Sequence, residues 1–145
     1  MNREQMLDRI IKKGKNSGTP LTFEIGSNSD LVLENTITGN LLYTIPRFAE
    51  EGEGKLTFPT KFHMVEPLLD LDHRGKVIFR MSVNPQPIIQ KIELGTSGLR
   101  QRIEAVNQMC EAGYPCGLLI APVILVELEG NVYRPLGRTE GRTFR

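Results

Sequence analysis

The chain has 145 residues and a formal net charge of +1, with 39% hydrophobic and 24% charged residues. This length suits a single domain with one core, and the composition is ordinary for a water-soluble protein. Basic residues gather near the two ends, which leaves nine basic and fourteen acidic residues between positions 19 and 130. A basic tail can contact nucleic acid, but an acidic body argues against a dedicated phosphate-binding surface.

The sequence shows no export signal and no membrane span. Charged residues interrupt the first apolar residues, and the longest apolar run, residues 117–126, is too short to cross a bilayer. The two cysteines lie six residues apart, and without an export signal we expect them to be free thiols in a reducing compartment. The sequence therefore predicts a cytoplasmic protein with no membrane partner.

The first part of the chain predicts two helices and two strands. A helix over residues 2–14 ends at a glycine, and residues 21–25 alternate as a strand. Residues 31–50 are predicted to be helical in their second half, where Pro46 should kink or shorten the helix. The next strand is expected over residues 55–58.

The middle of the chain is organised around residues 76–84, a mostly apolar run bounded by glycine and proline. Such a run predicts a buried strand of a parallel sheet. A short helix is expected before it, over residues 64–71. A helical or turn segment should follow it, over residues 85–94.

The clearest helix covers residues 98–112, with Ser97 as its N-cap and Gly113 just past its end. Apolar residues recur there at steps of four, three and four, which predicts one stripe buried against the sheet. This stripe consists of Leu99, Ile103, Val106 and Cys110. The wholly apolar run of residues 117–126 then predicts the last strand, although Pro122 implies an edge, a bulge or a strand end near Ala121.

Strands that begin near residues 21, 55, 76 and 116 are each followed by helical sequence. This alternation predicts right-handed βαβ units and an α/β fold with about four parallel strands. Four strands could form an open sheet or part of a (β/α) barrel. No covering helix is visible after the last strand, which favours a part-barrel over residues 1–130, an irregular tail over 131–145, and a fragment of a longer protein.

Small polar residues follow two of the predicted strands. Ser82 and Asn84 end the strand of residues 76–84, and a polar pentad, residues 26–30, follows the first strand. Ligands of α/β folds bind at the carboxyl ends of parallel strands, so both places are candidate sites. The alternative is that Ser82 and Asn84 cap the next turn, and that the pentad is a connector ending in the N-cap Asp30.

Five stretches occur together in one order over residues 19–127. They are FEIGSNSDLVLEN, LTFPTKF, LLDLDHRGKVIFRMSVNP, GTSGLRQRIEAVNQMCEAGYP and LLIAPVILVE. Together they resemble the spore photoproduct lyase family of radical S-adenosylmethionine enzymes. The resemblance implies a partial (β/α)6 barrel that binds S-adenosylmethionine across the carboxyl ends of its strands. It also implies a four-iron four-sulfur cluster on a Cys-x3-Cys-x2-Cys loop and, in the lyases, radical attack on a dimerised thymine in DNA.

The resemblance also implies which residues hold S-adenosylmethionine. By position these residues are Ser29, Lys61, Ser82 and Ala121, with Asn84 and Glu24 as weaker candidates for the same pocket. Lys61 would pair with the methionyl carboxylate, the two serines would bind other polar groups of the ligand, and the Ala121 backbone would contact the adenine.

The sequence departs from the family pattern in two places. No Cys-x3-Cys-x2-Cys occurs in it, so it holds no ligands for the cluster and no metal site, and the chain alone is expected to be inactive. Ser27 lies where the photoproduct lyases have a hydrogen-donating cysteine, and an O–H bond is too strong for that role. Cys116 begins its strand, at the face of the sheet opposite the site.

The sequence is compatible with three interpretations. In the first, the chain is part of a radical S-adenosylmethionine enzyme that acts on DNA or a related substrate. In the second it is a self-standing α/β nucleotide-binding domain without redox chemistry, and in the third it is a fragment with no function of its own.

Overall fold

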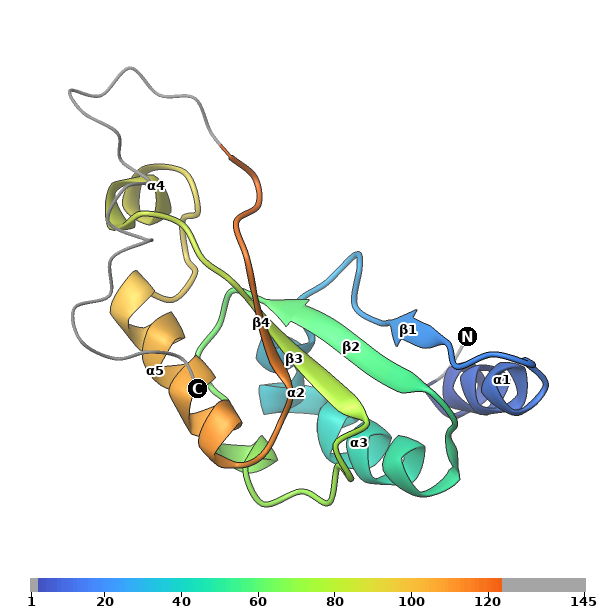
Figure 1. Ribbon diagram of the computed structural model, residues 1–145. Helices are drawn as coiled ribbons and strands as arrows, with labels where there is room; N and C mark the ends of the chain where they lie inside the picture. Colours follow the sequence, from blue (N-terminus) through green and yellow to red (C-terminus); the bar gives the residue numbers. More distant parts are fainter. Residues whose placement is uncertain (1–2, 124–145) are drawn as a thin grey trace.

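The computed structural model describes residues 3–123 (Figure 1). Its elements in chain order are α1 (Arg3–Lys15), β1 (Thr22–Glu24), α2 (Leu31–Thr38), α3 (Asn40–Glu51), β2 (Lys55–Thr60), the 3-10 turn η1 (Glu66–Leu68), β3 (Val77–Ser82), α4 (Gln86–Lys91), α5 (Leu99–Glu111) and β4 (Cys116–Leu119). None of these described helices is long and apolar enough to cross a membrane.

The strands form one sheet in the order β1-β2-β3-β4, and every neighbouring pair is parallel. Helical segments lie between successive strands, as parallel pairing requires. In the centre, Phe58 of β2 lies beside Phe79 of β3, which in turn lies beside Cys116 of β4. The α/β class and the four parallel strands predicted from the sequence are confirmed.

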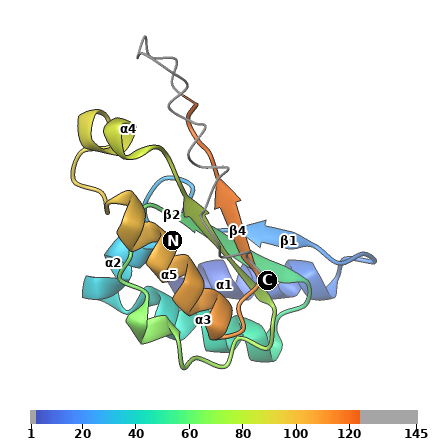
Figure 2. The ribbon, with the colours of Figure 1, turned by 60° about the vertical axis from the view of Figure 1, so that its left-hand side comes forward.

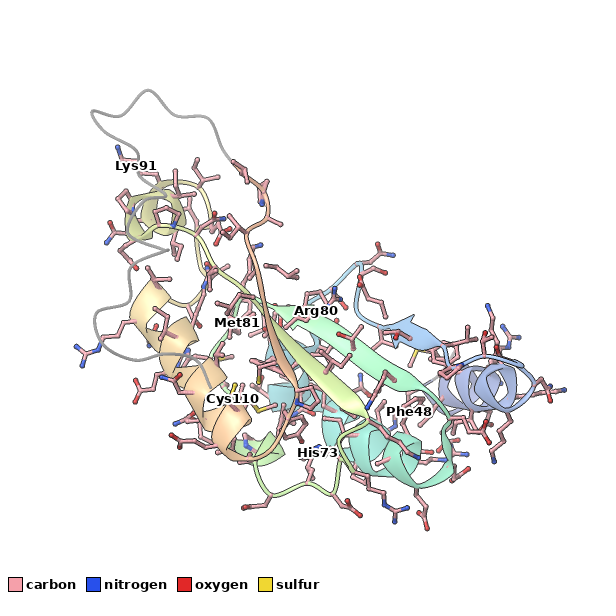
Figure 3. The ribbon with its side chains drawn as sticks, viewed as in Figure 1. Phe48, His73, Arg80, Met81, Lys91 and Cys110 are labelled. Atoms are coloured by element: carbon pink, nitrogen blue, oxygen red, sulfur yellow. The ribbon has the colours of Figure 1, made fainter. Side chains whose placement is uncertain are left out.

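The two faces of the sheet differ in what covers them. Along β3, Val77, Phe79 and Met81 are fully buried, whereas Ile78 and Arg80 are half-buried on the opposite side. Figure 2 shows α2, α3 and α5 together on one side of the sheet. Arg80 and Met81, neighbours on β3 that are labelled in Figure 3, therefore leave the strand on opposite faces. We call the side that carries Arg80 the open face.

One ion pair crosses the open face. Glu24 at the end of β1 binds Arg80 of β3, so the pair passes over the intervening strand β2. Only Nη2 of Arg80 reaches the carboxylate, while its Nε is buried and has no partner in the described part of the chain. The pair ties the short edge strand β1 to the centre of the sheet.

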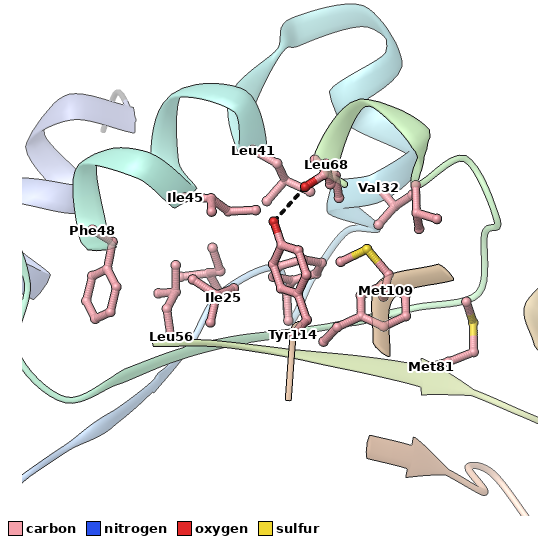
Figure 4. Close-up of a cluster of buried hydrophobic side chains, with 14 of the residues drawn as sticks. Ile25, Val32, Leu41, Ile45, Phe48, Leu56, Leu68, Met81, Met109 and Tyr114 are labelled. Atoms are coloured by element: carbon pink, nitrogen blue, oxygen red, sulfur yellow. Dashed lines mark hydrogen bonds between the residues drawn. The ribbon is translucent and has the colours of Figure 1, made fainter. Parts of the chain in front are cut away.

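The core fills the space between the sheet and the helices (Figure 4). The rings of Phe58 and Phe79 meet edge-on, with centroids 6.0 Å apart. Burial of one such side chain contributes about 1.5–3 kcal/mol to stability. Tyr114, which follows α5, reaches through the core and donates its hydroxyl to the carbonyl of Leu68 at 2.7 Å.

Residues 31–50 form two helices where the sequence pattern predicts one. α2 ends at Gly39, whose φ of 61° lies in the left-handed region that glycine adopts readily, and α3 begins at the next residue. The pattern misses α2 because the helix buries only Val32 and Asn35, too few to mark an apolar stripe.

Pro46 does not shorten α3, which runs through it to Glu51. The proline removes the hydrogen bond that an N–H at this position would give to the carbonyl of Leu42. Leu42 lies on the exposed side of the helix, where water can bind that carbonyl. The helix therefore tolerates a residue that the sequence rule treats as a stop.

The buried stripe predicted for α5 is confirmed in part. The buried residues of α5 are Arg102, Ala105, Val106 and Met109, so only Val106 of the predicted stripe is fully buried. Leu99, Ile103 and Cys110 are half-buried, and Leu99 and Cys110 pack against the core. The centre of the buried side is shifted toward Arg102, a charged residue that a hydrophobic pattern assigns to the surface. The predicted N-cap is wrong: Gly98 occupies that position, and its N–H donates to the side chain of Gln101 at 3.0 Å.

Two further elements are shorter than predicted. The helix expected over residues 64–71 is the single turn η1, and the last strand ends at Leu119. The remainder of that predicted strand from residue 124 on, and the tail predicted over residues 131–145, lie outside the described residues.

Candidate functional site at the carboxyl ends of β2 and β3

Five polar side chains converge where β2 and β3 end. Lys61 directly follows β2, Ser82 is the last residue of β3, and Asn84 lies two residues further on. Glu93 lies between α4 and α5, and Arg102 lies in the second turn of α5. We call these five residues the strand-end cluster.

Lys61 lies at the accessible side of the strand-end cluster, with 31% of its side chain exposed. Its ammonium lies 3.1 Å from the hydroxyl of Ser82 and 3.3 Å from the backbone carbonyl of Ala121. The Ser82 hydroxyl also lies 3.2 Å from that carbonyl, to which it donates. Three of the predicted site residues, which are up to 60 positions apart in sequence, are therefore brought together.

Asn84 lies deeper and is fully buried. Its side-chain Nδ2 donates to Oε1 of Glu93 at 2.8 Å. Its Oδ1 is also buried and has no partner among residues 3–123. A buried acceptor without a partner is unfavourable by itself, so this oxygen is suited to receive a donor from a ligand.

Arg102 is fully buried, and four acceptors surround its guanidinium. Nε donates to the carbonyl of Ser97 and Nη1 to the carbonyl of Ser82, each at 2.8 Å. Nη2 donates to Oε2 of Glu93 and to the hydroxyl of Thr96, each at 2.7 Å. One side chain thus joins the segment between α4 and α5 to the end of β3.

Glu93 carries the negative charge of the strand-end cluster, with only 5% of its side chain exposed. Burial alone would raise its pKa, but hydrogen bonds from Asn84 and Arg102 outweigh burial, with help from the charges of Arg102 and Lys61. The net effect is a pKa below the ordinary value of 4.5, so the carboxylate is ionised at neutral pH. Lys61 and Arg102 are the cations of the strand-end cluster and Glu93 is its anion, while the Asp30 carboxylate adds a second negative charge beside the Lys61 backbone at the same end of the sheet.

Sequence reasoning missed Glu93 and Arg102. A signal for Arg102 does exist, because it lies four and seven residues before Val106 and Met109, in phase with apolar side chains. A charged residue in such a stripe must find buried partners. Nothing comparable in the sequence marks Glu93.

The end of β1 is built differently. Ser27 and Ser29 are exposed, and no contact joins either side chain to the strand-end cluster in the described structure. Asp30 instead takes several roles: Oδ1 caps α2 by accepting from the backbone N–H of Val32 at 3.1 Å, and Oδ2 accepts from that of Lys61 at 2.8 Å. The connector with an Asp30 N-cap is therefore confirmed, whereas the binding role of Ser29 stays a prediction.

The strand-end cluster fits parts of S-adenosylmethionine. The ammonium of Lys61 and the hydroxyl of Ser82 are suitable donors for its carboxylate. The buried Oδ1 of Asn84 can accept from a hydroxyl or ammonium group. These donors and acceptors come from two adjacent strand ends, as expected for a ligand of an α/β sheet.

A four-iron four-sulfur cluster does not fit this chain. The full sequence has two cysteines, and the described residues contain no group of three or more His, Cys, Asp or Glu that could hold a metal ion. Burial, together with the neighbouring thiol of Cys110, raises the pKa of the Cys116 thiol well above its ordinary value. Ligation of iron requires thiolates, so no step that depends on the cluster is assigned to these residues.

Comparison of the sequence with known families identifies its relatives. The model of the spore photoproduct lyase family matches residues 2–139. Spore photoproduct lyase of Bacillus subtilis (strain 168) is 41% identical over 137 residues, which cover 94% of this chain and 40% of that protein. The corresponding protein of Geobacillus sp. (strain Y412MC61) is 38% identical over 101 residues, which cover 70% of this chain and 30% of that protein.

Solved structures agree with the sequence relatives. A spore photoproduct lyase complexed with dinucleoside spore photoproduct matches with a TM-score of 0.81 and 31% identity, over 87% of this chain and 37% of that one. A variant lyase with bound S-adenosylmethionine and dinucleoside spore photoproduct matches equally well. The chain thus spans about 40% or less of the length of these relatives, and its four strands match part of their radical S-adenosylmethionine barrel. The chain belongs to the spore photoproduct lyase family.

Proposed function

We propose that the strand-end cluster and the Ala121 backbone form part of the S-adenosylmethionine site of a radical enzyme resembling spore photoproduct lyase. The observation that carries this proposal is the convergence of Lys61, Ser82 and Ala121 within 3.3 Å contacts. The sequence resemblance implies a binding role for these three residues as well. Asn84 joins them as a buried acceptor, and Ser29 is included on resemblance alone.

The proposed roles follow from the chemistry of each group. Lys61 would bind the methionyl carboxylate, since it is the partly exposed cation of the strand-end cluster. Ser82 would donate to the same carboxylate once its hydroxyl turns away from the Ala121 carbonyl. Asn84 would accept a hydrogen bond from a hydroxyl or ammonium group of the ligand. Together these residues would bind and orient S-adenosylmethionine at one edge of the sheet.

The reaction class follows from the family rather than from these residues. S-adenosylmethionine bound with an iron–sulfur cluster supplies radical chemistry, and we propose a thymine lesion in DNA as the substrate of the complete enzyme. Ser27 would not serve as a hydrogen donor, because its O–H bond is too strong. The two free thiols, Cys110 and Cys116, fit a reducing compartment such as the cytoplasm.

A titration of the full chain with S-adenosylmethionine tests this proposal. Without the anchoring iron we expect a dissociation constant between roughly 100 μM and a few mM, measured by calorimetry or by shifts of backbone amide resonances. Lys61→Met should weaken binding by about tenfold, because it removes one charge-assisted contact to the carboxylate. Adenosine, which lacks the carboxylate, should bind Lys61→Met and the unmodified chain equally.

Lys91→Met is the matched control, since Lys91 is an exposed lysine of α4 outside the strand-end cluster (Figure 3). It should leave the affinity unchanged. The proposal fails if well-folded chain shows no binding at millimolar ligand, or if Lys61→Met binds as tightly as Lys91→Met.

A further inference from the structure

We infer that Glu93 is a positioning residue of the proposed site, and that Arg102 holds Glu93 in place for this purpose. Glu93 would fix which end of the Asn84 side-chain amide points inward, and it would hold the Lys61 ammonium in position. It would do both without contacting the ligand. This inference rests on the proposed function for its ligand. Its structural part concerns only contacts within the chain.

The carboxylate of Glu93 is shared by three donors. Oε1 accepts from Asn84 at 2.8 Å and lies 3.5 Å from the ammonium of Lys61. Oε2 accepts from Arg102 at 2.7 Å. The group is almost entirely buried, so all its strong partners come from the chain rather than from water.

An ionised carboxylate can only accept hydrogen bonds, whereas a side-chain amide donates at one end and accepts at the other. Glu93 therefore forces Asn84 to turn its Nδ2 inward, which leaves Oδ1 as the free end. The site thus presents an acceptor at this point and selects a donor on the ligand. An amide with no such partner could turn over and present a donor instead.

Glu93 acts on Lys61 in a similar way. The ammonium is partly exposed, and a long flexible side chain in that position loses conformational freedom only if something holds it. Contacts with Glu93, the Ser82 hydroxyl and the Ala121 carbonyl hold it on the side of the sheet where the ligand would lie. Prior ordering of this cation lowers the cost of binding an anion.

Arg102 provides the support beneath Glu93. Its guanidinium binds Glu93 and the Ser82 carbonyl with different nitrogens, so it fixes the carboxylate relative to the end of β3. Neither residue has a polar side-chain atom without a partner, since both oxygens of Glu93 and all three guanidinium nitrogens of Arg102 are bonded within the chain, unlike Oδ1 of Asn84. Both are therefore positioning residues rather than catalytic ones.

Glu93→Gln tests the inference, because it keeps the volume and most hydrogen bonds but removes the acceptor-only character. The first measurement needs no ligand: the rate of Lys61 acetylation by acetic anhydride, followed site by site by mass spectrometry. We expect the rate to rise about two- to fivefold once the ion pair is lost, with Lys91 unchanged as an internal reference. Glu104→Gln, which removes an exposed carboxylate of α5, should change neither rate.

The second measurement is the affinity for S-adenosylmethionine in a double-mutant cycle. Glu93→Gln should weaken binding about five- to tenfold in the unmodified chain. In the Asn84→Ala background the same change should have a clearly smaller effect, because there is no amide left to orient. Unfolding in urea, recorded for each variant, separates loss of fold from loss of positioning.

The outcomes are distinct. The inference is overturned if Glu93→Gln weakens S-adenosylmethionine binding equally in the unmodified chain and in the Asn84→Ala background. It is also overturned if the rate of Lys61 acetylation is unchanged in a folded Glu93→Gln chain. If no variant binds S-adenosylmethionine but Lys61 acetylation still accelerates in Glu93→Gln, the proposed function fails while the positioning of Lys61 stands.

Discussion

The ends of β1 and β3 are both polar, yet the structure treats them in opposite ways. After β1, Ser27 and Ser29 are exposed and stand apart from the strand-end cluster. At the end of β3, Ser82 and Asn84 are buried and bonded to Ala121 and Glu93, which lie in other segments of the chain. A position at a strand end therefore identifies a candidate residue, but partners from other segments decide whether the fold holds it in one position.

The difference follows from what lies over each strand end. β1 is a short edge strand, and the residues after it lead directly into the N-cap of α2. The end of β3 instead receives the segment between α4 and α5, which brings Glu93 and, one turn into α5, Arg102. Asp30 is the exception after β1, because its carboxylate reaches across to the end of β2.

The largest effect is expected from removing the guanidinium beneath β3. Arg102→Met keeps a long apolar stem but leaves the Glu93 carboxylate buried without its main partner. Breaking one side of such a pair should lower the free energy of unfolding by about 3–5 kcal/mol, measured by urea denaturation. Arg100→Met, on the exposed side of the same helix, should stay within about 0.5 kcal/mol. A loss below 1 kcal/mol for Arg102→Met would show that β3 does not depend on this support.

Asp30→Ala should have the next largest effect, about 2–3 kcal/mol, because it removes the cap of α2 and two acceptors for residues at the end of β2. Asp30→Asn separates these contributions, since asparagine still caps a helix but places an N–H group near another donor, the Lys61 backbone. Asp30→Asn should lower the free energy of unfolding by clearly less than Asp30→Ala does in the same denaturation experiment. Equal losses of unfolding free energy would mean that the cap contributes nothing.

Acid should weaken the end of β3 through Glu93. Its pKa is lower in the folded chain than its ordinary value of 4.5, so the unfolded chain binds the proton more readily. The stabilisation is therefore complete above about pH 4.5 and is lost as the pH falls through the lower, folded pKa. Urea midpoints recorded from pH 6 to pH 3 should fall less steeply for Glu93→Gln than for the unmodified chain. Parallel profiles would contradict the assignment.

The smallest effect is expected after β1. Ser29→Ala should change the free energy of unfolding by less than about 0.5 kcal/mol, because the side chain is exposed. If Ser29 contacts S-adenosylmethionine as the resemblance implies, affinity should still fall about two- to fivefold, the effect of one neutral hydrogen bond. Unchanged affinity in a calorimetric titration would remove Ser29 from the site.

The sequence predicts the fold well because its strongest signals are local. Glycine and proline bound the apolar run of β3, and strand and helix alternate along the chain, which is enough to indicate a parallel sheet. Lys61 and Ser82 were identified as candidates because both lie at strand ends and match a family pattern. The structure places their side chains in contact across 21 positions of sequence.

Other features could not be predicted from apolar periodicity. α2 has no apolar stripe, so a periodicity count passes over it although the capping residue Asp30 lies directly before it. The centre of the buried side of α5 was missed because Arg102 is buried by virtue of partners in the connection between α4 and α5 and at the end of β3. Glu93 carries no local signal at all, since its burial results from the donors that surround it.

The turn before β3 also shows how the candidate site is divided along the chain. Arg74 and Gly75 adopt φ values of 48° and 62°, and Arg74 is exposed. Residues before this turn provide Lys61, and residues after it provide the other four members of the strand-end cluster. A chain cut here would give two pieces of similar length, neither of which holds the whole cluster. The two pieces would have to associate through strand pairing between β2 and β3. Binding of S-adenosylmethionine would then report this association, because neither piece is expected to bind the ligand alone.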